Sequence, residues 1–292
     1  MHYKIIHAKS ILVSEPFSKE FNLNTYRGCE HACNYCYARA NKYLIHKDEK
    51  DFDQTIFVKI NAADLLRKEL AKLKKRCMIF LNSASDPYQI CEEKYGITRK
   101  VLEVINEYKF PCHIMTKSNL ILRDLDLLKN INENAFCTVS FTITTFNKRL
   151  LEIFEPRAPE PEKRLEAMNI ISENGIYTGV FFMPIIPYIT DSEENIENVV
   201  RKSKEKGAKY VIYSTLTLRD VQRERFMNLL KENFPDIFKT YEKLYGENQS
   251  PNKDYQKMLE KRLDIILKKH LMPKRIIYPL RGYIQKRLYE IK

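Results

Sequence analysis

The chain has 292 residues, and its 50 Lys and Arg against 38 Asp and Glu give a formal net charge of +12. This length suits one large α/β domain with an appendage, because single barrels often exceed the usual domain size. Seven cysteines, three of them in one short run, and no N-terminal signal peptide indicate a reducing, cytoplasmic setting rather than a disulfide framework. The longest apolar run, Val180–Ile189, contains two prolines and is too short to span a bilayer, so no membrane segment is expected.

Strand and helix patterns alternate along most of the chain. Phe21–Tyr26 is predicted to be the first strand, and a helix is expected from Cys33 to about His46. Ile56–Ile60 is a short β-rich run before a helix that Asn61 can cap. The later predicted strands, each a nearly continuous apolar run, are Cys77–Leu81, Cys112–Thr116, Phe136–Thr145, Ile176–Ile186 and Tyr210–Thr215. The helices between them are expected to begin at Thr98, Asp124, Pro161 and the D-x-x-E pair Asp191 and Glu194.

Repeated βα units with apolar strands predict a parallel sheet covered by helices, here a partial (β/α)6 TIM-type barrel. We expect this α/β barrel, with a short N-terminal arm, to occupy residues 1–216 and a basic, helical C-terminal extension to occupy residues 217–292. Residues 251–292 contain 12 Lys and Arg against 4 Asp and Glu. Such clustered charge suits a polyanion such as nucleic acid, or else forms a solvated lysine-rich helix face.

The strongest motif is Cys29, Cys33 and Cys36, which have C-x3-C-x2-C spacing in a loop that follows the first strand. Three thiolates brought to one centre favour an iron–sulfur cluster or zinc. A four-iron cluster bound by three cysteines keeps one iron free for another ligand, which points to chemistry rather than structure alone. The alternative is a structural zinc site in which His31 supplies the fourth ligand.

The motif and its surroundings resemble the radical S-adenosylmethionine (SAM) superfamily, and in particular its spore photoproduct lyase-like, or DNA repair photolyase-like, branch. The resemblance covers roughly residues 20–215 in the family's order. The matching stretches are Tyr26–Arg39, Ser85–Gln89, Met115–Ser118, Leu120–Asp124, Ser140–Thr145 and Glu155–Pro159. It implies that the three cysteines bind a 4Fe-4S cluster and that the open iron chelates the amino and carboxylate groups of S-adenosyl-L-methionine. It also implies reductive cleavage to a 5′-deoxyadenosyl radical, with electrons from a donor such as flavodoxin or ferredoxin.

Two predicted cofactor contacts lie on strands of the barrel. Lys117 ends the third strand, where the resemblance implies a contact with the cofactor carboxylate; otherwise it is a solvated lysine. Ser140 shares one strand face with Thr142 and Thr144, opposite the apolar Val139 and Phe141. That polar face is expected to line the barrel interior, where the Ser140 hydroxyl can bond to the cofactor, while Cys137 by the same parity belongs to the outer core.

The other predicted contacts rest on the resemblance. Ser83 or Asp86 corresponds to the segment near the cofactor amino group, although both also suit a turn before Pro87. Tyr35 resembles the aromatic residue along the adenine. Met183, which opens the segment Met183–Ile186, resembles a hydrophobic shelf that ordinary core packing would also explain.

Tyr37 resembles a catalytic relay tyrosine next to the cluster. Ser83 stands where spore photoproduct lyase has a hydrogen-donating cysteine, and a hydroxyl O–H bond is too strong to replace a thiol; Cys91 is the nearby substitute. The neighbouring pairs Glu155 with Arg157 and Glu162 with Arg164 are expected near the barrel mouth as ion pairs or substrate contacts.

Three functions remain open at this stage. The first is a radical SAM lyase-like enzyme acting on a macromolecular substrate, with nucleic acid bound through the basic C-terminal region. The second keeps the radical chemistry but modifies a peptide, a tRNA or a small molecule, as the serine at position 83 suggests. The third is a non-catalytic, metal-stabilised nucleic-acid-binding protein.

Overall fold

The computed structural model describes residues 1–14, 20–44 and 49–277. Its main sheet has seven strands in the order β10-β9-β8-β7-β6-β3-β2. Six of them are parallel and only β2 runs antiparallel. The strands are β2 (Leu12–Ser14), β3 (Phe21–Leu23), β6 (Ile79–Leu81), β7 (Cys112–Thr116), β8 (Cys137–Thr142), β9 (Tyr177–Ile185) and β10 (Val211–Thr215). The six parallel strands confirm the predicted partial (β/α)6 architecture.

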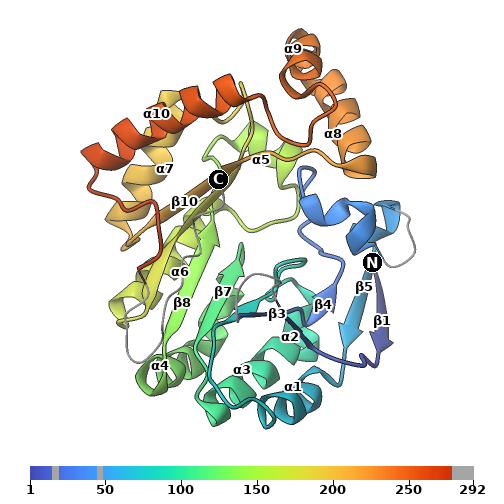
Figure 1. Ribbon diagram of the computed structural model, residues 1–292, viewed down its shortest axis with the longest axis vertical. Helices are drawn as coiled ribbons and strands as arrows, with labels where there is room; N and C mark the ends of the chain where they lie inside the picture. Colours follow the sequence, from blue (N-terminus) through green and yellow to red (C-terminus); the bar gives the residue numbers. More distant parts are fainter. Residues whose placement is uncertain (15–19, 45–48, 278–292) are drawn as a thin grey trace.

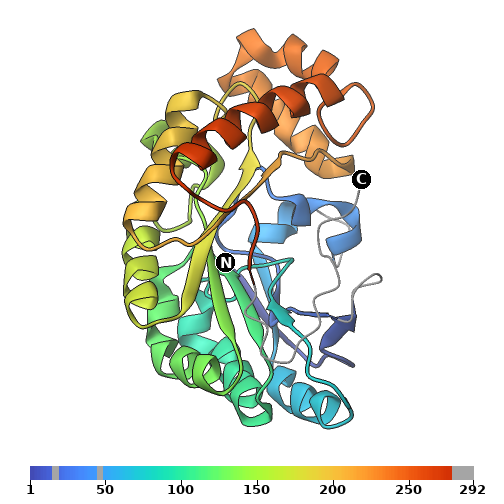
Figure 2. The ribbon, with the colours of Figure 1, turned by 60° about the vertical axis from the view of Figure 1, so that its left-hand side comes forward.

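Helices cover the outer face of this sheet (Figures 1 and 2). They are α1 (Ala62–Leu70), α3 (Ile97–Tyr108), α4 (Leu125–Asn134), α6 (Pro161–Glu173) and α7 (Glu193–Glu205). Two short helices, α2 (Cys91–Tyr95) and α5 (Lys148–Phe154), lie in the connections that follow β6 and β8. The outward side chains Cys137, Val139 and Phe141 of β8 are fully buried in the main core, as predicted. Complete burial of an aliphatic or aromatic side chain contributes about 1.5–3 kcal/mol, so this layer supplies much of the cohesion.

The inner face of the sheet carries polar and aromatic groups. The Ser140 hydroxyl lies 2.7 Å from Nε2 of His113 on β7 and 2.7 Å from the hydroxyl of Tyr210, just before β10. Gly179 on β9 faces the Tyr210 ring so closely that a Cβ there would lie 2.4 Å from it. A glycine is therefore required for this ring to fill the barrel interior.

A second, three-stranded sheet has the order β1-β5-β4 and lies beside the barrel (Figure 1). Its strands are β1 (His2–Ile6), β4 (Tyr26–Arg27) and β5 (Thr55–Lys59). The predicted strand at positions 21–26 is therefore two strands, because the chain leaves the main sheet after Leu23 and pairs with β5 from Tyr26 onward.

The helix predicted from Cys33 to about His46 is wrong over its described part. The chain instead forms two short 3-10 turns, η1 (Tyr37–Arg39) and η2 (Asn41–Tyr43), with Ala40 extended between them. Contacts with distant segments hold the chain open: the Asn34 amide donates to the Phe154 carbonyl at 2.9 Å, and Arg39 Nε donates to the Cys33 carbonyl at 3.0 Å. Two further 3-10 segments are η3 (Glu49–Asp53) and η4 (Asn119–Asp124).

Several predicted helix caps have other partners. Thr98 lies inside α3 and its hydroxyl donates to the Pro87 carbonyl, while Asp124 precedes α4 but pairs with Arg99 and Arg123. At α7 the cap is Ser192, whose hydroxyl accepts from the Asn195 amide, rather than Asp191. Tertiary hydrogen bonds have replaced the local ones that these side chains make in isolated helices.

Beyond β10 the described chain is helical, with α8 (Asp220–Asn233), α9 (Pro235–Tyr245) and α10 (Lys253–Lys269) at one end of the barrel (Figure 2). The division of the chain at residue 216 stays a prediction. After α10 the chain returns along the open edge, where the Val211 amide donates to the Pro273 carbonyl at 2.9 Å. In the described part of the chain no helix is both long and apolar enough to cross a membrane.

Candidate active site

The cysteine loop connects β4 to η1 at the ends of the barrel strands. Gly28 begins it with φ +81°, and a Cβ there would lie 2.6 Å from the Thr55 carbonyl oxygen and 2.8 Å from that of Phe52. The next amide, that of Cys29, donates to the Phe52 carbonyl at 3.0 Å. Because only glycine tolerates both this conformation and this close approach, Gly28 sets the position of the first cysteine.

Cys29 and Cys33 are buried and Cys36 is half-buried. Burial raises the pKa of the Cys33 thiol to about 12, and burial also raises that of Cys29, with Asp86 and the other two cysteines adding to the effect. Thiolates in such a place need positive charge beside them, which the irons of a cluster would supply. The donor set therefore fits a cluster.

The described side chains do not include three His, Cys, Asp or Glu groups gathered closely enough to hold a single metal ion. The zinc alternative, with His31 as the fourth ligand, stays a prediction beside the cluster.

The loop is braced from two sides. Asn34 donates to the Ile153 carbonyl at 2.6 Å and accepts from Arg225 of α8 at 2.7 Å. Gln222, also on α8, donates to the Tyr35 carbonyl at 3.2 Å. Helix α8 thus contacts the loop and lies next to it in Figure 1.

A buried charged group lies next to the loop, and two of its members, Lys117 and Tyr35, are residues that the sequence predicts. The Lys117 ammonium lies 5.6 Å from the centre of the Tyr35 ring. The Tyr35 hydroxyl donates to Glu155, whose other oxygen accepts from Arg164 at 2.5 Å. Thr144 donates to the same carboxylate at 2.9 Å. We name Tyr35, Lys117, Glu155 and Arg164 the Glu155 group.

Within the Glu155 group, the cations Arg164 and Lys117 stabilise the charged form of the Glu155 carboxylate. Burial would raise the pKa of Glu155, but Arg164 and Lys117 lower it to about 2. Burial would lower the pKa of Lys117, but Cys33 and Glu155 more than offset it, so the pKa of the ammonium is raised. Lys117 is therefore a fixed cation directly beside the cysteine loop.

The structure corrects the predicted ion pairs. Arg164 pairs with Glu155 rather than with Glu162, and Arg157 pairs with Asp53 at 2.8 Å rather than with Glu155. Asp53 also binds Arg39, which holds the end of η3 against η1. Sequence reasoning missed these ion pairs of Glu155 and Asp53, because the arginine that binds each carboxylate lies on another segment. The one sequence feature that could have indicated a role for Glu155 is its place in a stretch that matches the family.

Asp86 is buried and all its contacts are within the protein. It accepts from the Thr116 hydroxyl at 2.7 Å and from the Lys117 amide at 2.7 Å, and it lies 3.2 Å from Nε2 of His31. Burial would raise the pKa of Asp86, but His31 lowers it to about 2. The carboxylate thus ties the cysteine loop to the end of β7, and its predicted contact with a cofactor amino group stays a prediction.

Tyr37 and Ser83 lie together at the mouth. The Tyr37 hydroxyl donates to the Ser83 carbonyl, and the Tyr37 ring is 41% exposed, so it faces the space where a substrate would approach. Cys91 is instead buried, with its amide donating to Glu30 at 2.6 Å. The structure therefore brings the predicted relay tyrosine next to the serine in the donor position. Cys91 is buried in the core and its backbone holds Glu30, so its contacts are structural.

Ser140 and Met183 lie deeper in the barrel. Ser140 pairs in register with Met115, two residues before Lys117, and its hydroxyl is bonded to His113 and Tyr210. Met183 packs against Tyr210 and neighbouring apolar side chains on the inner wall. The structure does not join either residue to the Glu155 group, so their predicted cofactor contacts stay predictions.

Comparison with known proteins identifies the family to which this chain belongs. Residues 23–202 match the family model described as the Radical SAM superfamily. An uncharacterized protein of Mycobacterium tuberculosis is 31% identical over 252 residues, covering 86% of this chain and 74% of that protein. Spore photoproduct lyase of Clostridium acetobutylicum is 27% identical over 209 residues, covering 69% of this chain and 57% of that enzyme.

The fold is shared with solved structures. Spore photoproduct lyase complexed with dinucleoside spore photoproduct superposes with a TM-score of 0.68 at 16% identity, covering 92% of this chain and 79% of that one. Membership in the matched family implies S-adenosylmethionine and a 4Fe-4S cluster as cofactors. The chain therefore belongs to the radical SAM superfamily, as a radical SAM enzyme with the fold of spore photoproduct lyase.

Proposed function

We propose that this enzyme holds a 4Fe-4S cluster on Cys29, Cys33 and Cys36 and uses S-adenosylmethionine to abstract hydrogen from a nucleic-acid substrate, as a lyase-like reaction. When both are bound, the cluster would supply one electron for the reductive cleavage of S-adenosylmethionine, and the cofactor would supply the radical that abstracts hydrogen. The likeness to spore photoproduct lyase supports the reaction class. The net charge of +12 supports a polyanionic substrate.

The observation that carries the proposal is the position of Lys117. Against the effect of burial, Cys33 and Glu155 raise the pKa of its ammonium, which lies 5.6 Å from the centre of the Tyr35 ring. A carboxylate brought to the cysteine loop would meet this cation, while the Tyr35 ring offers an apolar surface for an adenine. Buried, pre-oriented charge of this kind binds an anionic group without reorganisation.

Residues at the mouth complete the site. Tyr37 projects from the end of η1 against the backbone of Ser83, where it can pass a hydrogen between the reacting centre and a donor. Asp86 accepts from the amide of Lys117 and lies 3.2 Å from Nε2 of His31, so it stands between the end of β7 and the cysteine loop. Gln222 and Arg225 of α8 hold the backbone of Tyr35 and the side chain of Asn34 in place.

The test is anaerobic reconstitution with iron and sulfide, followed by dithionite and S-adenosylmethionine. We expect 5′-deoxyadenosine from the parent protein and a large loss in Lys117→Met with iron content unchanged. Lys100→Met, at an exposed position on α3, is the matched control. Absence of 5′-deoxyadenosine from a fully iron-loaded parent protein would contradict the proposal.

A second candidate keeps the chemistry and changes the substrate to a peptide, a tRNA or a small molecule. The observation that favours it is the identity of residue 83. The Tyr37 hydroxyl donates to the backbone carbonyl of this residue, and its side chain is a hydroxyl rather than a thiol. Oligonucleotides that contain thymine dimers separate the two candidates, because clean reversal of the lesion would rule out the second. An electron donor such as flavodoxin or ferredoxin is part of both proposals.

A further inference from the structure

The outward face of the three-stranded sheet is basic. Pairing places Lys4 of β1 beside Phe57 of β5, Phe57 beside Arg27 of β4, and Ile6 beside Lys59 of β5, so these side chains share one face. The opposite face, with Tyr26, Ile56 and Val58, is buried in the main core. None of the three strands contains an Asp or Glu. We name Lys4, Arg27 and Lys59 the basic sheet face.

No carboxylate of the described residues lies within ion-pair distance of these three cations. Arg27 and Lys4 are exposed and Lys59 is half-buried, with its ammonium donating to the Asn24 carbonyl at 2.7 Å. Burial and the neighbouring Arg27 lower the pKa of Lys59 to about 8. Cations held together without an acid repel each other, and an anion bound between them would relieve that repulsion.

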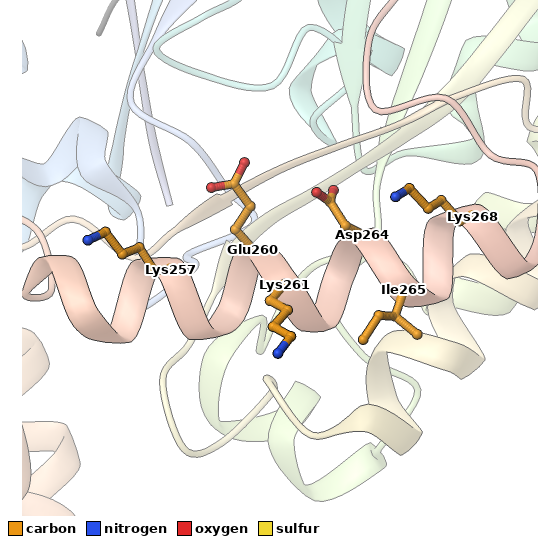
Figure 3. Close-up of a pocket in the computed structure, with 6 residues that line it drawn as sticks. All are labelled: Lys257, Glu260, Lys261, Asp264, Ile265 and Lys268. Atoms are coloured by element: carbon orange, nitrogen blue, oxygen red, sulfur yellow. The ribbon is translucent and has the colours of Figure 1, made fainter.

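The basic residues of the C-terminal helix differ in this respect. Figure 3 shows a shallow pocket of about 390 Å³ on α10, where Lys257, Lys261 and Lys268 alternate with Glu260 and Asp264. Further along, Lys274 lies 2.8 Å from Asp264, and Lys269 lies 2.9 Å from Glu197. Acidic neighbours offset much of this helix's charge. Of the 12 basic residues in 251–292, those at positions 281, 286, 287 and 292 lie outside the described residues.

The basic sheet face is continuous with the mouth of the site. Asn24, which accepts from Lys59, uses its side-chain oxygen to accept from the Ala84 amide at 2.8 Å. Ala84 follows Ser83, whose carbonyl accepts from Tyr37. Hydrogen bonds therefore link Lys59 to Tyr37 through two intervening segments, which places this end of the basic sheet face near the mouth.

We propose that the basic sheet face binds the phosphodiester backbone of a single-stranded nucleic-acid substrate and leads it to Tyr37. Lys4 and Arg27 lie on the two strands that flank β5, about 10 Å apart, and Lys59 lies about 6.6 Å along β5 from the Phe57 between them. One extended strand can therefore bring several phosphates to these three cations. Chemistry on a nucleotide requires it to leave a duplex stack, and a single strand meets that requirement at the lowest cost. This inference rests on the proposed function and names its substrate surface.

The test is anisotropy of a fluorescein-labelled single-stranded DNA oligonucleotide, and RNA of the same sequence, titrated with cluster-loaded protein over a range of salt concentrations. The variant is Lys4→Gln/Arg27→Gln/Lys59→Gln. The control, Lys257→Gln/Lys261→Gln/Lys268→Gln on α10, removes the same charge. Three lost phosphate contacts reduce the salt slope by about 2 and weaken binding about 100-fold at about 0.1 M salt. The control is expected to leave affinity and slope near those of the parent.

The single variant Arg27→Gln keeps the test decisive if the triple variant does not fold, because Arg27 is exposed. Its expected loss is about fivefold. Iron content and dithionite-driven 5′-deoxyadenosine formation, measured on the same preparations, report on the proposed function separately. They are expected to be unchanged in both triple variants.

Two results would overturn the inference. Unchanged affinity in the sheet variants, or an equal loss in the α10 control, would move nucleic-acid binding elsewhere, the latter to the C-terminal extension predicted from sequence. If the sheet variants kept oligonucleotide affinity but were no longer reduced by flavodoxin, while dithionite still reduced them, the face would be a docking surface for the electron donor.

Discussion

The buried pair of Arg164 and Glu155 offers the sharpest test of how the site is held together. Both side chains are at most 1% exposed. Arg164 also donates to the Pro159 carbonyl at 2.7 Å and to the Thr142 carbonyl at 2.9 Å. In Arg164→Met, Glu155 would remain buried with only Lys117, Tyr35 and Thr144 near it.

Two routes give a similar magnitude for the cost. The pKa of Glu155 falls from 4.5 to about 2 in the folded protein although burial opposes the shift, and this net change corresponds to about 3 kcal/mol. Removing one partner of a buried pair typically costs about 3–5 kcal/mol. We therefore expect Arg164→Met to lower the free energy of unfolding by about 3 kcal/mol and the Tm by roughly 6–12 °C.

The assay is urea unfolding under anaerobic conditions at neutral pH. Arg201→Met is the matched control, because Arg201 forms an exposed pair with Glu205 at 2.8 Å that contributes about 0.5 kcal/mol or less. The double variant Arg164→Met/Glu155→Gln should recover part of the loss, since the carboxylate no longer stays buried without Arg164. If Arg164→Met costs no more than Arg201→Met, the reasoning about the Glu155 group is wrong.

The same carboxylate gives a pH dependence with a definite sign. Because the folded-state pKa of Glu155 is lower than its unfolded value, its contribution is fully present above pH 4.5. As the pH falls from 4.5 toward 2, the unfolded chain takes up the proton first and the contribution is lost. Unfolding midpoints of the parent should therefore fall more steeply over this range than those of Glu155→Gln.

Three further predictions concern single residues. Gly28→Ala should lower iron loading and Tm, whereas Gly175→Ala, where φ is also positive but the space is open, should lower Tm only; normal loading in Gly28→Ala would contradict this. Burial lowers the pKa of His113 from 6.5 to about 3, so the unfolded state binds more protons between these values and stability should fall as pH drops through them. Urea midpoints that change with pH equally in His113→Gln would refute that. Tyr37→Phe should retain dithionite-driven 5′-deoxyadenosine formation without substrate but slow substrate turnover; unchanged turnover would remove Tyr37 from the reaction.

Much of the fold could be predicted because most of its strands are continuous apolar runs that are visible in the local sequence. The apolar runs around Ile79, Ile114, Val139 and Val180 each form a parallel strand, since both faces of such a strand are covered. The alternation around Ser140 also predicts which face lines the barrel. These features depend on residues near one another in the sequence, so they can be seen without the structure.

The cysteine loop shows where local reasoning fails. Residues 33–44 have helical composition, yet hydrogen bonds to Phe154 and Ile153 and the contacts of Arg39 hold them in an open course. The same is true of the ion pairs: Asp53 meets Arg157 across 104 positions of sequence. Sequence proximity suggested the wrong partners because the right ones are brought together only by the fold.

The site itself was predictable in part. Lys117 and Tyr35 lie next to the cysteines, and Tyr37 lies next to Ser83. Ser140 was placed correctly on the inner face, but its depth depends on the register of β7 and β8, which a pattern does not fix. Glu155 was paired with Arg157 rather than with Arg164, because a carboxylate inside a buried group cannot be told from a surface one by its sequence.

The central claim is that three cysteines hold a cluster with one iron left open for S-adenosylmethionine. The most direct measurement is the electron paramagnetic resonance spectrum of the reduced, reconstituted protein before and after S-adenosylmethionine is added. We predict a signal of a reduced 4Fe-4S cluster whose shape changes on addition, and loss of that signal in Cys29→Ala, Cys33→Ala and Cys36→Ala. A signal that S-adenosylmethionine leaves unchanged, or that survives the loss of one of these cysteines, would contradict the account.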